Sequence, residues 1–138
     1  MSSQINFFTK NRKSFKTSRN ILFSFKFALS GLVYCFNNTR NFRVQILFAF
    51  LIILCSFIFG CNLNEFRIII STIFSVLSLE LINTAIESIV DLKVKQNFNK
   101  LAKISKDCSA ASVFLASINS VFVAAFIFLP KIRLLLFS

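Results

Sequence analysis

Three long apolar runs constrain the fold of this chain more than any other feature of its sequence. The runs at about 44–60, 66–90 and 110–129 are each long enough to cross a hydrocarbon core of about 30 Å as a helix. Polar or basic connections separate them, and the mean hydropathy of the whole chain is +0.74. The sequence therefore predicts an all-α membrane protein with three transmembrane helices.

Two further segments precede the first predicted span. Residues 1–20 are polar and basic, and residues 21–36 mix Phe, Leu and Ala with Lys26 and Ser30. This mixture suits an amphipathic helix that lies at the membrane surface. We therefore divide the chain into an N-terminal tail, 1–20, and one membrane domain, 21–138.

The basic residues indicate a topology. Of 16 Lys and Arg residues, eight lie between Lys10 and Arg43, five lie between Lys93 and Lys106, and three lie elsewhere. The positive-inside rule then predicts that the N-terminus and the second connection face the cytoplasm, or the stroma if the membrane is a plastid one. This distribution explains the net charge of +11 without nucleic-acid binding. Abundant Phe, Ile, Asn and Lys is typical of A+T-rich coding, as in plastids and some bacteria.

The acidic residues are few, and most of them gather on the second predicted span. Glu80, Asn83, Glu87 and Asp91 follow one another at spacings of +3, +4 and +4. At 100° per residue they fall within an arc of roughly 80° on one face of a helix. The sequence thus predicts a polar stripe near the cytoplasmic end of this span.

Such a stripe has the groups needed for phosphoryl transfer. Carboxylates bind Mg²⁺ and accept protons from hydroxyl groups, while nearby lysines such as Lys103 and Lys106 balance phosphate charge. The same residues could instead relay protons, hold helices together or pair with Lys93 or Lys95. The chain has no Walker A or protein-kinase motif, no CxxC pair and no His, which argues against soluble nucleotidases and Cys/His metal sites.

The stripe belongs to a longer motif. Residues 80–92, ELINTAIESIVDL, resemble the motif E-x-x-N-[ST]-A-I-E-x-x-V-D of the prokaryotic diacylglycerol kinase family. Residues 106–111, KDCSAA, resemble its second conserved patch, and residues 25–32 and 40–43 are similar to its amphipathic helix and the following turn.

The resemblance covers about residues 20 to 132. Within it, residues 101–107 and the ending at 128–131 are more similar to the Gram-positive undecaprenol kinase branch of the family. The resemblance implies a homotrimer of three-span subunits with active sites shared between neighbouring subunits at the cytoplasmic membrane surface.

The resemblance also implies roles for individual residues. Glu80 would be the general base for the lipid hydroxyl, and Asn83 would position substrate or phosphate. Glu87 would bind Mg²⁺ and Lys106 would contact the ATP phosphates. Asp91 and Asp107 would support the nucleotide site.

The sequence departs from the family pattern at three positions. Thr39 stands before the R-N-F-R turn, where many members have a Glu that binds metal. Phe98 and Asn99 replace a Tyr-His pair at the positions that contact the nucleotide. We expect the loss of the Glu to weaken metal binding, and the loss of the Tyr-His pair to change the adenine contact more than the reaction.

The sequence thus favours an enzyme that transfers the γ-phosphate of ATP, with Mg²⁺, to the hydroxyl of diacylglycerol or undecaprenol. The alternatives are an inactive relative and a non-catalytic small membrane protein that serves in packing, assembly or ion conduction. The expected location is a bacterial inner membrane or a plastid membrane.

Overall fold

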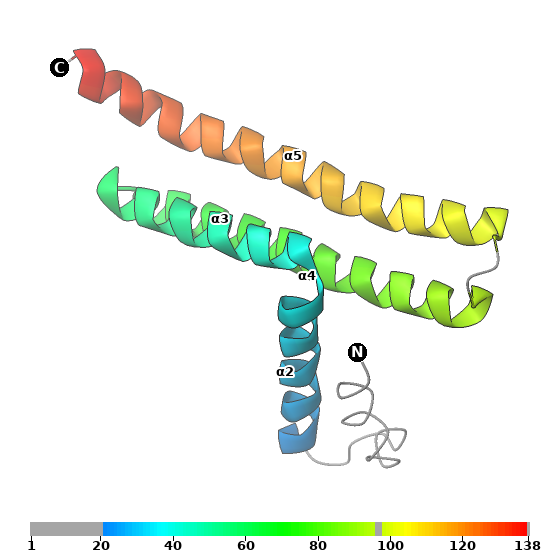
Figure 1. Cartoon of the computed structure of the whole chain (residues 1–138). Coiled ribbons are helices and arrows are strands. Elements are labelled where there is room, and N and C mark those ends of the chain that lie inside the picture. Colours follow the sequence, from blue (N-terminus) through cyan, green and yellow to red (C-terminus); the bar gives the residue numbers. More distant parts are fainter. Residues whose placement is uncertain (1–20, 96–97, 138) are drawn as a thin grey trace. The chain divides into compact units, whose positions relative to one another are not determined.

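The computed structural model describes residues 21–95 and 98–137, and the elements within this part are all helices (Figure 1). The helices are α2 (Ile21–Asn38), α3 (Arg40–Ile58), α4 (Leu63–Val94) and α5 (Lys100–Phe137). The predicted all-α class is therefore confirmed. The predicted tail, 1–20, lies outside the described residues. The chain divides into two compact units between Val33 and Tyr34, and α3, α4 and α5 lie wholly within the second.

The helices α3, α4 and α5 are each long and apolar enough to cross a membrane. Many large apolar side chains on them are exposed, including Phe50 (64%), Phe57 (70%) and Phe126 (79%). A water-soluble surface rarely carries so much contiguous apolar area, whereas lipid tails would cover it. The protein is thus an integral membrane protein with three spans.

Short local motifs set the boundaries of α3. Thr39 has extended backbone dihedral angles of −109° and 120°, so α2 and α3 are separate helices. At the other end, Gly60 adopts a left-handed φ of 58°. The N–H groups of Gly60 and Cys61 donate to the carbonyls of Phe57 and Ser56 at 3.2 and 2.9 Å. This is a Schellman motif, and it turns the chain towards α4.

A capping box begins α4. The Asn62 side chain accepts hydrogen bonds from the N–H groups of Asn64 and Glu65, both at 3.0 Å, and Glu65 Oε2 accepts from the Asn62 N–H at 2.7 Å. These bonds satisfy backbone donors that the first helical turn leaves unpaired. The capping box therefore fixes where the second span begins.

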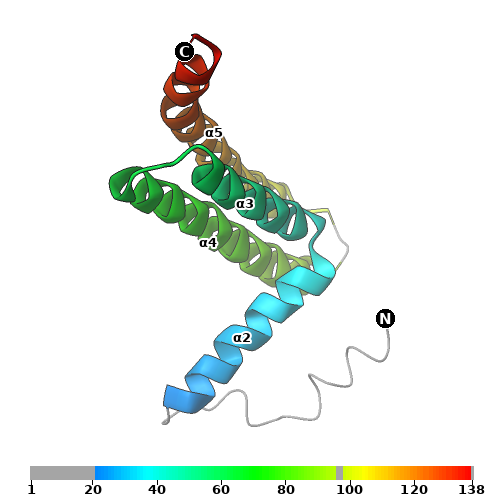
Figure 2. The same cartoon turned by 90° about the vertical axis from the view of Figure 1, so that its left-hand side faces the viewer.

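The α4 helix is the central element of the bundle. Figures 1 and 2 show α3 along its first half and α5 antiparallel beside it. Ile69 of α4 packs with Ile127 and Phe128 of α5, and the Phe59 and Phe128 rings lie 5.7 Å apart. This apolar core lies towards the α3–α4 turn, so the other half of the α4–α5 pair is left for polar groups.

The helix α5 continues through Pro130 to Phe137, whereas the sequence placed the end of the third span at that proline. Proline cannot donate to the carbonyl four residues earlier, here that of Phe126. Membrane helices tolerate such a break in the backbone hydrogen bonds when the surroundings satisfy the freed group. The run expected to cross the membrane, 110–129, lies inside this longer helix.

Candidate functional site

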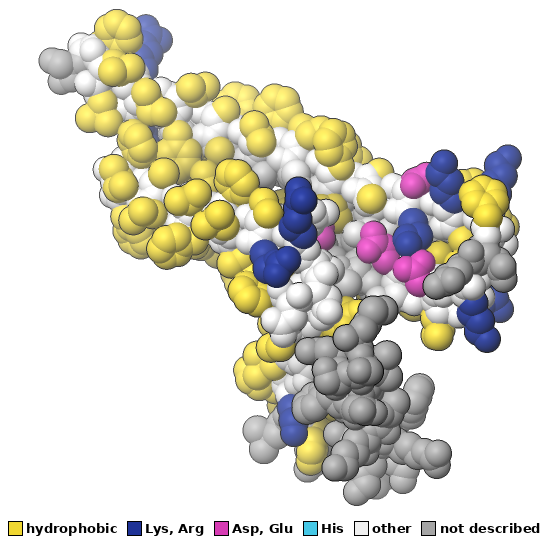
Figure 3. Space-filling model, viewed as in Figure 1, with side chains coloured by type: hydrophobic (Ala, Val, Ile, Leu, Met, Phe, Trp, Pro, Cys, Tyr) yellow, Lys and Arg dark blue, Asp and Glu magenta, His cyan; other side chains and the backbone are white. Residues whose placement is uncertain are grey.

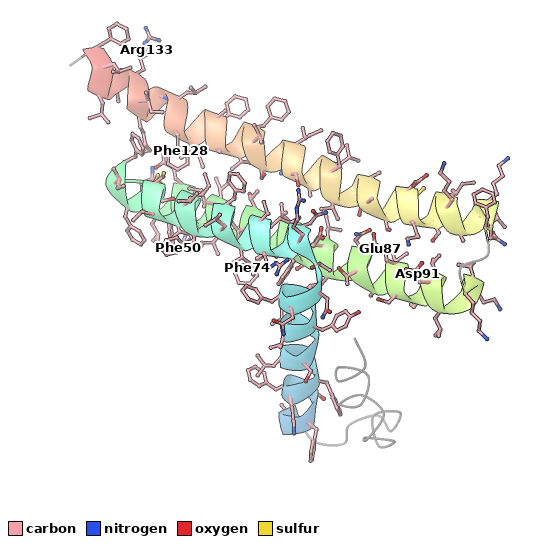
Figure 4. All side chains as sticks on the ribbon, viewed as in Figure 1. Phe50, Phe74, Glu87, Asp91, Phe128 and Arg133 are labelled. Carbon is pink, nitrogen blue, oxygen red and sulfur yellow. The ribbon has the colours of Figure 1, made fainter. Side chains whose placement is uncertain are left out.

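The polar stripe of α4 passes from the buried interior to the surface. Glu80 is 2% exposed and Asn83 is 6% exposed, whereas Glu87 is half-buried and the Asp91 side chain is 63% exposed. Figure 4 shows Glu87 and Asp91 on the half of α4 that leads to the α5 connection. Figure 3 shows most acidic side chains on this half, with several basic ones around them, whereas apolar side chains cover the other half of the pair.

Glu80 is bound from the first span. Gln45 of α3 donates from Nε2 to Glu80 Oε2 at 3.1 Å. The Thr84 hydroxyl donates to the Glu80 backbone carbonyl at 2.9 Å and therefore does not bind the Glu80 carboxylate. The other amide atom, Gln45 Oε1, is buried and has no hydrogen-bond partner in the described part of the chain.

Asn83 connects α4 with α5. The Ser109 hydroxyl lies 2.7 Å from Asn83 Oδ1 and 2.9 Å from the Lys106 carbonyl, and its single proton can go to one of them at a time. When Asn83 Oδ1 accepts from Ser109, its Nδ2 points to Glu87 and donates to Oε1 at 3.3 Å. Ser109 thereby sets which face of the Asn83 amide is turned to the acid.

The exposed end of the stripe carries an ion pair between helices. Lys106 Nζ of α5 lies 2.9 Å from Asp91 Oδ1, so the partner of Asp91 is Lys106 rather than Lys93 or Lys95. Asp107 is exposed, and no described residue forms a hydrogen bond or ion pair with its side chain. One residue along a helix turns about 100°, which separates the directions of Lys106 and Asp107.

Two of the three departures from the family pattern, Thr39 and Asn99, form local structural hydrogen bonds. The Thr39 hydroxyl donates to the Cys35 carbonyl at 2.7 Å, at the break between α2 and α3. The Asn99 side chain accepts from the N–H groups of Leu101 and Ala102 at 2.9 and 3.1 Å, which makes it the N-cap of α5. Phe98 is 85% exposed beside it. The structure thus does not bring Phe98 and Asn99 into the hydrogen bonds of the stripe.

Cys35, near the end of α2, is another buried group associated with the stripe. It is 4% exposed. Burial raises the pKa of its thiol most, the nearby Thr84 side chain lowers it, and the charge of Glu80 raises it. The thiol therefore lies within electrostatic reach of the buried carboxylate.

An apolar cavity of about 420 Å³ opens between α3, α4 and α5. Gln45 and Phe48 line it from α3, Val76 and Leu77 from α4, and Ser120 and Val121 from α5. Since Gln45 also binds Glu80, one amide group joins the apolar cavity to the buried carboxylate.

The sequence prediction missed two residues of this site. Gln45 supplies the hydrogen bond that joins Glu80 to α3, and Ser109 supplies the one that joins Asn83 to α5. The signal for Gln45 was a single amide near the start of an apolar span, and the signal for Ser109 was its place in the KDCSAA patch. Neither signal predicts the side chain with which the residue forms its hydrogen bond.

The donor atoms near Glu87 suit Mg²⁺. The described residues contain no group of three Asp, Glu or Cys side chains that could hold a metal ion by themselves. Glu87 has a carboxylate engaged by only one 3.3 Å bond from an amide. Magnesium characteristically takes one or two protein carboxylates and completes its shell with phosphate and water oxygens. One half-buried carboxylate beside exposed polar groups fits that pattern.

Comparison with known proteins identifies the family. The sequence profile of the prokaryotic diacylglycerol kinase family matches residues 26–128. A diacylglycerol kinase of Synechocystis is 36% identical over 121 residues, which are 88% of this chain and 69% of that protein. An undecaprenol kinase of Bacillus subtilis is 36% identical over 109 residues, which are 79% of this chain and 88% of that protein.

A more distant relative agrees. A diacylglycerol kinase of Haemophilus influenzae is 34% identical over 97 residues, which are 70% of this chain and 81% of that protein. The matched region includes the whole polar stripe and the three spans up to Phe128. The chain therefore belongs to the prokaryotic diacylglycerol kinase family of membrane lipid kinases.

Proposed function

We propose that the protein transfers the γ-phosphate of ATP to the hydroxyl of diacylglycerol or undecaprenol. The observation that carries the proposal is the buried Glu80 carboxylate, which the Gln45 amide joins to an apolar cavity between the spans. A lipid alcohol needs an apolar surface for its chains and an acceptor for its hydroxyl proton. The cavity and the carboxylate provide these two features next to each other.

Glu80 is the proposed general base. A general base must lie within hydrogen-bond reach of the proton that it removes. No described group donates to Glu80 Oε1, so this oxygen remains available to the lipid hydroxyl. As the proton moves to Glu80, the lipid oxygen forms a bond to the γ-phosphorus, and the bond to the β–γ bridging oxygen breaks and releases ADP.

The remaining residues bind and orient the phosphates. Glu87 would hold Mg²⁺, which supplies charge neutralisation for the phosphate oxygens when bound. Asn83, fixed by Ser109, would position substrate or phosphate beside Glu87. Asp91 would orient the Lys106 ammonium group before ATP binds, and Lys106 would then bond to an ATP phosphate instead of Asp91.

The nucleotide approaches from the exposed end of the stripe in this proposal. Asp107 is exposed there and has no described partner, and Phe98 and Asn99 follow the end of α4. The 13 basic residues of the N-terminal region and the second connection support a cytoplasmic or stromal location for this end, by the positive-inside rule. We also propose the homotrimer that the family resemblance implies.

A labelling assay with the purified full-length chain tests the function. Detergent micelles containing either diacylglycerol or undecaprenol would receive γ-³²P-ATP and Mg²⁺. We expect labelled phosphatidic acid or labelled undecaprenyl phosphate, and the ratio of the two initial rates identifies the substrate. No label in either lipid would overturn the proposal in favour of the non-catalytic or inactive alternative.

A further inference from the structure

Gln45 contacts the proposed base with only half of its amide group. Its Nε2 donates to Glu80 Oε2 at 3.1 Å, whereas its Oε1 is buried without a partner in the described structure. Gln45 also lines the apolar cavity, and its Oε1 atom itself is inaccessible to solvent. A buried carbonyl oxygen without a hydrogen bond is unfavourable, and native structures contain few of them.

A general base changes its hydrogen-bonding character during the reaction. A carboxylate only accepts hydrogen bonds, whereas the carboxylic acid formed by proton transfer also donates one. A neighbour with a donor alone, such as Lys, would favour only the charged state. A terminal amide has both a donor and an acceptor, and its last torsion has two broad minima about 180° apart.

We propose that Gln45 is a positioning residue that serves Glu80 in both of its protonation states. In the resting state Nε2 holds the carboxylate, as observed, and directs its free oxygen to the lipid hydroxyl. After Glu80 has taken the proton on this free oxygen, its carboxyl group rotates about its last torsion and brings the new O–H to Gln45. The amide then turns over, so that Gln45 Oε1 accepts a hydrogen bond from the carboxylic acid. The exchange loses one hydrogen bond and gains one, because Oε1 has no earlier partner to give up.

The inference rests on the proposed function, and steady-state kinetics of the full-length protein test it. Gln45→Met keeps the length and the apolar stem of the side chain but replaces its polar amide with an apolar thioether. We expect kcat to fall about 10- to 100-fold, as for other losses of positioning, with KM for lipid and for ATP within about twofold of wild type. Gln45→His restores a donor and an acceptor on one uncharged ring, and it should recover part of the lost kcat.

Ser75→Ala is the matched control. Ser75 lies on α4 outside the residues that line the cavity, and its hydroxyl donates to the Ser71 carbonyl at 2.9 Å and does not contact an acid. This variant should retain wild-type kcat, and thermal unfolding of every variant shows whether a loss comes from misfolding. A folded Gln45→Met protein with wild-type kcat would overturn the inference, as would a folded Gln45→His protein no faster than Gln45→Met. A wild-type protein inactive on both lipids would instead overturn the proposed function.

Discussion

The helix α4 carries acids in two regions whose surroundings differ. At its start, Glu65 accepts from the Asn62 N–H at 2.7 Å and from Lys131 Nζ at 3.0 Å. Both partners of Glu65 come from the protein itself. Through them Glu65 links the α3–α4 turn to α5. Each bond there has a clear structural purpose.

The second region, from Glu80 to Asp91, is incompletely paired. Glu80 has one amide partner, Gln45 Oε1 has none among the described residues, and Glu87 accepts one long bond from Asn83. Acids on one helix face also repel one another unless a cation or a proton intervenes. Pairing, rather than the number of acids, thus distinguishes the region that stabilises the fold from the region that we propose binds ligands.

The largest difference between the regions should come from removing the proposed metal carboxylate. We expect Glu87→Ala to lower the rate of lipid phosphorylation about 100-fold, the scale for losing one group that stabilises transition-state charge. The residual rate should require a higher Mg²⁺ concentration for half-saturation. A magnesium titration of the initial rate measures both effects, and an unchanged titration curve would remove Glu87 from the metal site.

The two interhelical lysines provide the next comparison. Lys106→Ala should raise KM for ATP about tenfold, because a charge-assisted bond to phosphate is lost. Lys131→Ala removes a bond of similar length to Glu65, 3.0 Å against 2.9 Å, but should leave KM for ATP unchanged. Equal effects of the two substitutions would show that Lys106 has only a structural role.

A smaller effect is expected from the cap of α4. Asn62→Ala removes the side-chain acceptor for two backbone N–H groups and should lower the free energy of unfolding by about 1 kcal/mol. Asn62→Ser keeps a capping oxygen and should recover most of this loss. Reversible unfolding in mixed micelles measures the stability of both variants. A folded Asn62→Ala protein with a reduced turnover number would contradict the division between the two regions.

The smallest effect concerns the thiol beside the stripe. Because burial raises the pKa of Cys35, its reactive thiolate forms at higher pH than in an ordinary cysteine. Alkylation of Cys35 by iodoacetamide should therefore be slow at pH 8 and continue to accelerate above about pH 9, past the ordinary thiol pKa. Single-cysteine variants retaining Cys35 or the exposed Cys108 allow the rates to be compared. Equal rates at pH 8 would show that Cys35 is not shielded.

Much of the fold was predictable because the relevant signals are local. The length of an apolar run decides whether a helix can span a bilayer, and the +3 and +4 spacings place Glu80 and Asp91 on one face whatever surrounds the helix. The structure confirmed the three-span class, and the comparison with known proteins confirmed the family that the motif had indicated.

The partners of the stripe were not predictable, because they depend on how helices rotate against one another. Gln45 lies 35 residues from Glu80, and Ser109 lies 26 residues from Asn83. No spacing rule connects such pairs. The burial of Glu80 and the exposure of Asp91 likewise follow from α3 packing along only the first half of α4 (Figure 1).

The central claim is that the second region performs phosphoryl transfer and the first only supports the fold. It is tested most directly by measuring lipid phosphorylation and thermal unfolding of Glu80→Gln and Glu65→Gln side by side. We predict that Glu80→Gln loses about 10²- to 10⁴-fold in rate, the contribution expected of a general base, while remaining folded. Glu65→Gln should unfold more easily and keep its rate. A Glu80→Gln protein as active as wild type would contradict the account.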